Sequence, residues 1–159
     1  MLSVAVRIAE ALRIPLNELA SGSSQRVDLS GDWWAAWQTF KGGEEVITSQ
    51  ELRLHQQYET ITVITLTRGI EVDEGGYMWR GEMRLWDNEI LMGWYAADDG
   101  AVRSKGTMYF VLHPHGINMR GRWVGLSYDG DVMTGWGAFA HTEDEARGLI
   151  EGLKSGTGS

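Results

Sequence analysis

Residues 77–97, YMWRGEMRLWDNEILMGWYAA, contain two alternating runs that meet at Asp87-Asn88. In the first run Tyr77 and every second residue after it are apolar or glycine, whereas the residues between them are mostly charged. A period of two is typical of a β-strand with one buried face. Asp and Asn tolerate the positive φ that tight hairpin turns require. The stretch therefore predicts two antiparallel strands joined by a hairpin.

The same pattern extends in both directions from this hairpin. Strand-like runs are separated by short turns rich in Gly, Asp and Asn. The runs are residues 31–40, 44–57, 58–70, 77–86, 89–97, 105–113, 117–128 and 131–141. Eight strands are the number at which an antiparallel meander can close on itself. We therefore expect a mainly β fold, an eight-stranded antiparallel up-and-down β-barrel of calycin-like type.

Helical spacing flanks the strand region on both sides. Between Leu2 and Ala20 the apolar residues recur at helical intervals, and Pro15 both ends one helix and can begin the next. After the last strand, Thr142 with Glu145 three residues later matches a reciprocal helix N-cap. We expect two short N-terminal helices and one C-terminal helix.

Composition excludes several classes of site. The 159 residues are 43% hydrophobic and 23% charged, as in a globular protein. The absence of cysteine excludes disulfides, thiolate metal sites and cysteine nucleophiles. A formal net charge of −8 disfavours non-specific binding of nucleic acid. With no apolar run of membrane-spanning length, we expect a cytoplasmic protein without a membrane partner.

The stretch VAVRIAEALRIPLNELA, residues 4–20, resembles the end of a Cro/C1-type (XRE) helix-turn-helix domain. In that family the fourth helix reads I-A-x-A-L, here Ile8 to Leu12, and a short fifth helix reads P-L-x-E-L, here Pro15 to Leu19. The three helices before them, including the one that reads DNA, are missing from this sequence. The resemblance implies a transcriptional regulator that binds DNA only through a missing N-terminal domain. Simple packing of an amphipathic helix on the barrel is the alternative.

These patterns divide the chain into five expected parts. They are a helix-turn-helix remnant at residues 1–20, a linker at 21–29, the β-barrel at 30–141, the C-terminal helix at 142–154 and a disordered tail at 155–159.

A second resemblance starts at GDWWAAW, residues 31–37. It looks like the G-x-W opening of the calycins, the lipocalin and avidin barrels, with Gly31 and Trp33 at the matching positions. The resemblance implies that Trp33 closes one end of the barrel while the other end is open to ligand. Residues 106–125 also look like small bacterial β-barrel sensors, including cyclic-nucleotide-binding barrels of antiphage systems.

Alternation also predicts which side chains face the barrel interior, since the more apolar face of each strand should point inward. The aromatic and methionine side chains so selected form the candidate ligand-binding set. They are Trp33, Trp37, Tyr77, Trp79, Met83, Met92, Trp94, Tyr109, Met119, Trp123 and Trp136. The same rule turns Val111, Val132, Thr134, Ala138 and Ala140 inward, and turns Trp34 outward against a terminal helix or a partner chain.

The nature of this lining leaves two interpretations open. Large rings dominate most protein cores, so the set could be solid packing. Interleaved glycines favour a cavity instead, and indoles would suit an aromatic or cationic ligand through stacking and cation–π contact. Arg80 with Arg84, and Arg120 with Arg122, would hold an anion only if their faces looked inward.

Catalytic and metal signals are weak. His113-Pro114-His115 reads as a turn rather than a metal site, since further ligands would be needed. No nucleophile elbow, phosphate-binding glycine loop or zinc-protease motif is present, so we expect no enzyme, no metal and no cofactor.

The sequence therefore predicts the effector-binding domain of a homodimeric XRE-family regulator, with a small molecule as its partner. Two alternatives remain open. One is a stand-alone calycin-like carrier or barrel enzyme, and the other is a solidly packed dimerisation domain.

Overall fold

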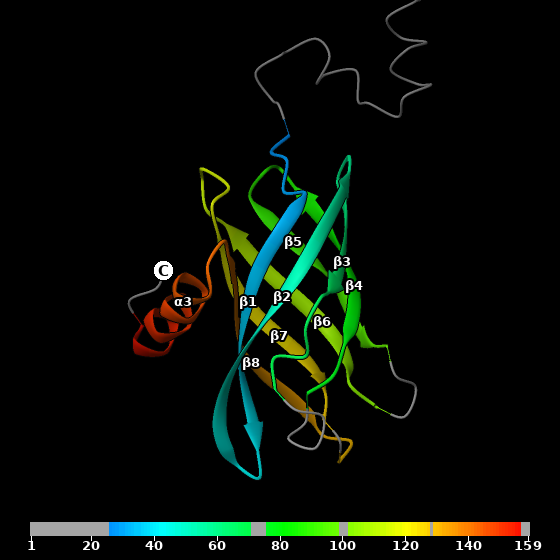
Figure 1. The fold of residues 1–159 in the computed structure, drawn as a ribbon, viewed down its shortest axis with the longest axis vertical. Coiled ribbons are helices and arrows are strands. Elements are labelled where there is room, and N and C mark those ends of the chain that lie inside the picture. The colour runs from blue at the N-terminus through cyan, green and yellow to red at the C-terminus, as the bar shows by residue number, and fades with distance from the viewer. Residues whose placement is uncertain (1–25, 71–75, 99–101, 128, 157–159) are drawn as a thin grey trace, which may run out of the picture.

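A computed structural model describes residues 26–70, 76–98, 102–127 and 129–156. Within these residues eight strands form a closed barrel, and one helix follows the last strand (Figure 1). The strands are β1 (Gly31–Lys41), β2 (Glu44–Gln57), β3 (Thr60–Thr65), β4 (Trp79–Trp86), β5 (Ile90–Ala97), β6 (Lys105–Leu112), β7 (Met119–Leu126) and β8 (Val132–Ala140), and the helix is α3 (Glu143–Ser155).

Each strand pairs antiparallel with the next one in the sequence, and β8 returns to pair with β1. This is the predicted mainly β fold, an eight-stranded antiparallel up-and-down barrel with a C-terminal helix, and it is confirmed. The expected helices within residues 1–20 lie outside the described residues. The division of the chain into five parts stays a prediction.

One end of the barrel, here called the capped end, is crossed by residues 26–30. The Leu29 N–H donates to Gln56 Oε1 at 2.7 Å, and Gln56 Nε2 donates to the Val27 carbonyl at 2.9 Å. The Val27 N–H donates to Asn88 Oδ1 at 3.0 Å, which ties the segment to the β4–β5 turn. Leu29 is thereby held over the interior, only 1% exposed.

The opposite end, here called the loop end, carries the β1–β2, β3–β4, β5–β6 and β7–β8 connections (Figure 1). The structure therefore has two unlike ends, one sealed by a hydrogen-bonded segment and one that carries the two longest connections, β3–β4 and β5–β6.

Helix α3 covers the seam between β1 and β8. Thr142 caps it by accepting from the Glu145 N–H at 3.2 Å, and Gly156 ends it in a left-handed conformation. Its buried residues Ala146 and Ile150 join a second apolar cluster on the outside of the barrel, with Trp34 partly buried beside them. The predicted outward direction of Trp34, against a terminal helix, is thus confirmed.

Glycines allow the strands to bend tightly around the barrel. A Cβ at Gly121 would stand 1.8 Å from the Tyr109 carbonyl oxygen, and one at Gly93 would stand 1.8 Å from the Glu82 carbonyl oxygen. No side chain fits at such an approach, so these positions require glycine.

Candidate functional site

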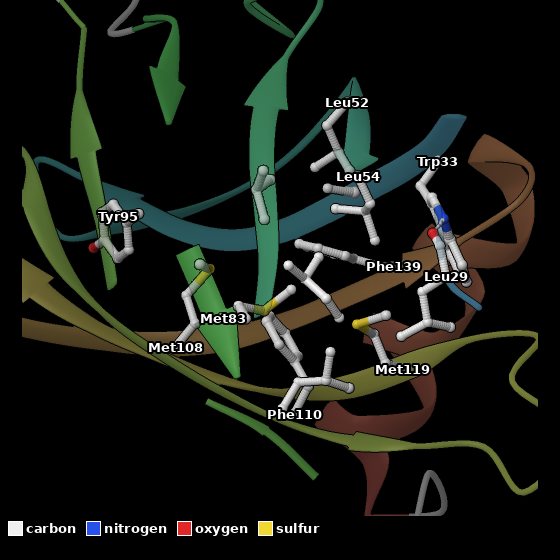
Figure 2. Packing of buried hydrophobic residues seen from close by; sticks show 14 of the residues in the cluster. Leu29, Trp33, Leu52, Leu54, Met83, Tyr95, Met108, Phe110, Met119 and Phe139 are labelled. Atoms are coloured by element: carbon white, nitrogen blue, oxygen red, sulfur yellow. Dashed lines mark hydrogen bonds between the residues drawn. The ribbon is translucent and has the colours of Figure 1, made fainter. Parts of the chain in front are cut away.

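The middle of the barrel is filled by aromatic rings. Trp37 packs edge to face with Trp79 at a centroid distance of 5.7 Å and with Phe139 at 5.6 Å. Phe110 and Phe139 are 4.9 Å apart. Figure 2 shows these two phenylalanines together with Met83 between the capped end and Tyr95. The centre is a core in which rings contact rings.

The indole N–H groups inside the barrel all have protein acceptors. Trp33 donates to the Leu29 carbonyl at 2.8 Å (Figure 2). Trp37 and Trp79 both donate to Gln50 Oε1, at 3.1 Å and 2.7 Å. The remaining interior indole, that of Trp123, donates to a backbone carbonyl at 3.0 Å. These donors are committed to the fold, so a ligand would meet the rings rather than their N–H groups.

The space left by the interior glycines is occupied by neighbouring rings. A Cβ at Gly137 would lie 2.6 Å from the Trp37 ring, and one at Gly125 would lie 2.0 Å from the Tyr95 hydroxyl oxygen. The expectation that glycines leave ligand space in the middle of the barrel is therefore wrong at these positions. They make room for large side chains of the protein itself.

Most of the candidate ligand-binding set does face the interior. The inward residues are Trp33, Trp37, Tyr77, Trp79, Met83, Met119 and Trp123. Trp33 lies at the capped end, 2% exposed, with its ring centroid 4.0 Å from that of His141. Whether any member of the set binds a ligand stays a prediction.

The expectation that Met92, Trp94 and Tyr109 face inward is wrong, and so is that for Val111. Their side chains stand on the outer face and are 41%, 43%, 45% and 41% exposed. The residues that point inward from β5 and β6 are Leu91, Tyr95, Met108, Phe110 and Leu112.

Two features explain the error on β5: the more apolar face, which the rule turns inward, is the outer one, and the preceding turn is one residue longer than expected. Trp86 pairs with Ile90, so the turn holds three residues, 87–89, instead of Asp87-Asn88 alone. Moving Glu89 from the strand into the turn shifts the register by one residue. A shift of one residue sends every side chain of the strand to the other face.

The inward direction expected for Trp136, Val132, Thr134, Ala138 and Ala140 is also wrong. Ala138 and Ala140 are buried outside the barrel, where they belong to the apolar cluster under α3 with Trp136 beside them. On β8 the interior side belongs to Phe139 and to glycines that face the indoles. The outer face of β8 is therefore apolar because helix α3 covers it.

Exposure of the inward side chains increases toward the loop end. Leu54, Ile61 and Met119 are at most 1% exposed, Tyr95 and Trp37 are 8% and 9% exposed, and Tyr77 and Trp123 are only partly buried. The loop end is thus the side from which solvent reaches the interior rings.

Hydroxyl groups gather at this loop end. Tyr77 Oη and Ser104 Oγ lie 2.5 Å apart in a hydrogen bond. Burial raises the pKa of both Tyr77 and Tyr95, while hydrogen bonding to Ser104 works in the opposite direction. Sequence reasoning selected Tyr77 but missed Tyr95 and Ser104, because Tyr95 was assigned to the wrong face and serine gave no signal.

The loop end combines aromatic rings with hydroxyls whose neutral form burial favours. Within the described ranges, no cluster of three or more His, Asp or Glu side chains is placed to bind a metal ion. His113 and His115 lie 5.5 Å apart, ring to ring, in the β6–β7 turn of the capped end. No helix in the described part of the chain is long and apolar enough to span a membrane.

No protein-family model and no curated protein matches this chain. Among solved structures it is similar to a redesigned β-barrel, with 13% sequence identity and a TM-score of 0.52. The match covers 72% of this chain and 92% of the designed one. This likeness supports the eight-stranded barrel architecture and carries no information on ligand or family.

Proposed function

We propose that this barrel binds a small effector at its loop end, as the sensor domain of an XRE-type transcriptional regulator, without catalysing a reaction. The observation that carries the proposal is the unlike character of the two ends. Leu29 and Trp33 seal one end, whereas rings and hydroxyls at the other are partly open to solvent. Such one-sided access suits a barrel that admits one small molecule.

The ligand site is restricted to this end, because the middle of the barrel is packed. Trp79 and Tyr95 would form its floor, and Tyr77 and Trp123 its walls. An aromatic or cationic compound would contact the rings by stacking or cation–π interaction. Ser104 and Tyr77 would supply hydrogen bonds that fix its orientation.

The regulatory part of the proposal rests on the resemblance at residues 4–20. An effector changes DNA binding only if it binds the two states of a regulator with different affinity. The intact protein would be a cytoplasmic homodimer that binds DNA through helices upstream of Leu2. The gene sequence upstream of the codon for Met1 tests this part, and its failure would leave the ligand site untouched.

A thermal-shift screen with aromatic, cationic and nucleotide compounds tests the site directly, followed by titration of tryptophan fluorescence. The proposal expects a hit that stabilises the wild type, since a ligand that binds only the folded state raises its stability. Ser104→Ala and Tyr77→Phe should weaken that hit about tenfold, the size of one lost hydrogen bond. Tyr109→Phe, on the outer face, is the matched control and should leave it unchanged.

The packed dimerisation domain is the second candidate function, and the ring contacts around Trp37 favour it. It expects no shift with any compound and a concentration-dependent dimer in sedimentation. A hit that is turned over rather than bound would favour the barrel enzyme, and a hit in a chain without upstream helices would favour the stand-alone carrier.

A further inference from the structure

Large apolar side chains are exposed on the outside of β4, β5, β6 and β7, and we call this surface the basic-apolar face. Its apolar members are between 41% and 52% exposed. They are Trp86, Met92, Trp94, Tyr109, Val111 and Val124. Neighbouring strands bring them together, since Met92 pairs with Tyr109 and Ile90 pairs with Val111.

Cations border this apolar stripe. The outward positions of the same strands carry the cations Arg80, Arg84, Lys105, Arg120 and Arg122. Glu82 is the one acidic residue on strands β4 to β7, whose residues the structure describes in full. The face is therefore positive although the chain as a whole has a formal net charge of −8.

Negative charge is concentrated on the other side of the barrel. In the closed ring β5 lies across from β1, so α3, which covers the β1–β8 seam, is opposite the β4–β5 part of the basic-apolar face, whereas Arg120 on β7 pairs with Ala138 beside the helix. The carboxylates of β1, β2 and α3 are Asp32, Glu44, Glu45, Glu51, Glu143, Asp144, Glu145 and Glu151. These carboxylates outnumber the cations of the same three elements, which are Lys41, Arg53, Arg147 and Lys154. This side of the barrel is therefore acidic, and the β4–β7 side is basic.

The cations of the face keep hydrogen-bonding capacity for a partner. Arg80 pairs with Asp98 at 3.2 Å at the rim, and Arg84 approaches Glu59 only to 3.8 Å. Arg122 lies over the Trp136 ring at 4.2 Å and donates to a threonine hydroxyl at 3.3 Å. No described carboxylate is within ion-pair distance of this guanidinium.

A depression opens at the β4–β5 side of the face. Its volume is about 240 Å³, and its lining includes Arg84, Met92 and Trp94 together with the acidic residue Glu82. An apolar side chain placed there would contact Met92 and Trp94, and a carboxylate beside it would compete with Glu59 and Glu82 for Arg84. The depression therefore provides an anchor of the kind that dominates protein interfaces.

We propose that the basic-apolar face docks an acidic protein segment that also carries apolar side chains. Charge complementarity selects the acidic residues, and the stripe between the cations selects the apolar ones. A second copy of this chain fits less well, because a two-fold contact would place arginines against arginines on two convex surfaces. Nucleic acid is the competing occupant, because Trp86, Trp94 and Tyr109 are exposed rings on which bases stack. The aliphatic side chains of Met92, Val111 and Val124 beside these rings favour the peptide, and the test below separates the two.

Selection from a random 12-residue peptide library tests the proposal. Wild-type protein is the bait, and a variant carrying Arg120→Glu and Arg122→Glu is the counter-selection target. We expect enriched peptides with net negative charge and interspersed apolar residues. Their affinity, measured by fluorescence polarisation, should fall at least about tenfold in this variant and on raising the salt from about 0.05 to about 0.5 M.

A second variant, Trp94→Ser with Met92→Ser, separates docking from loss of folding. Both side chains are more than 40% exposed, so the fold should persist, as thermal unfolding would show, while peptide affinity falls. Neutral or basic enriched peptides, or equal binding to the charge-reversed variant, would overturn the proposal. So would tighter binding of a labelled oligothymidine than of any peptide, or self-association abolished by either variant.

Discussion

The indole N–H of Trp79 donates to the side-chain oxygen of Gln50 at 2.7 Å inside the barrel. The same oxygen accepts from Trp37 at 3.1 Å, and Gln50 is only 5% exposed. One amide group therefore satisfies two buried indoles from different strands.

Replacing this amide should destabilise the protein strongly. Gln50→Leu keeps the volume but leaves both indole N–H groups without an acceptor, at a cost of about 2–4 kcal/mol. Urea unfolding followed by circular dichroism measures the change. Gln57→Leu, at the exposed end of β2, is the matched control and should stay within about 0.5 kcal/mol of the wild type. Equal effects of the two substitutions would show that the buried amide is dispensable.

Two glycine substitutions should change the stability of the protein in opposite directions. Gly121→Ala would place a methyl group 1.8 Å from the Tyr109 carbonyl oxygen, so the barrel must distort or fail to fold. Gly148→Ala, in α3 with nothing within 4 Å, should stabilise the protein by about 0.5–1 kcal/mol through helix propensity. Thermal unfolding of both variants checks this, and a tolerated Gly121→Ala would contradict the close approach of β6 and β7.

The loop-end tyrosines should make the protein sensitive to alkali. Burial raises the pKa of Tyr77 and Tyr95 above the ordinary value of about 10, so the folded state favours the neutral phenols. Their contribution is complete below about pH 10 and is lost as the pH rises toward the folded-state pKa. Unfolding free energies between about pH 8 and pH 11 should fall less steeply for Tyr95→Phe than for the wild type. Identical pH dependence of the unfolding free energy in the two proteins would contradict the prediction.

Helix α3 should stabilise the barrel seam through one buried side chain. Ile150 is fully buried in the outer apolar cluster, so Ile150→Ala should cost about 2–4 kcal/mol of unfolding free energy. Glu151→Ala, on the exposed side of the same helix turn, should change it by less than about 0.5 kcal/mol. If denaturation midpoints for the two variants coincide, α3 contributes little to holding the seam.

The fold could be predicted from the sequence because its signals are local. Alternation, Gly- and Asp-rich turns and the Thr142 cap each act over a few residues, and each appears in the structure. The outward position of Trp34 followed from the same alternation once a covering helix was expected after β8.

Strand faces were harder to predict because they depend on contacts distant in sequence. The outer faces of β5 and β6 are apolar without being buried, so Met92 and Tyr109 mimic core residues. On β8 the glycines look like poor core residues until the rings of Trp37 and Trp123 are seen to fill the space above them. Neither relationship can be recognised from the order of apolar and polar residues within one strand.

The pairing of β8 with β1 also dictates when the barrel can be completed. Trp34 pairs with Ala140, so the ring joins the first and last strands of the described chain. During synthesis one edge of β1 stays unpaired until β8 has left the ribosome. Strand pairs that are distant in sequence form slowly. Helix α3 follows β8 directly and covers this junction, so the next element of the chain shields the strand edges that remain unpaired longest.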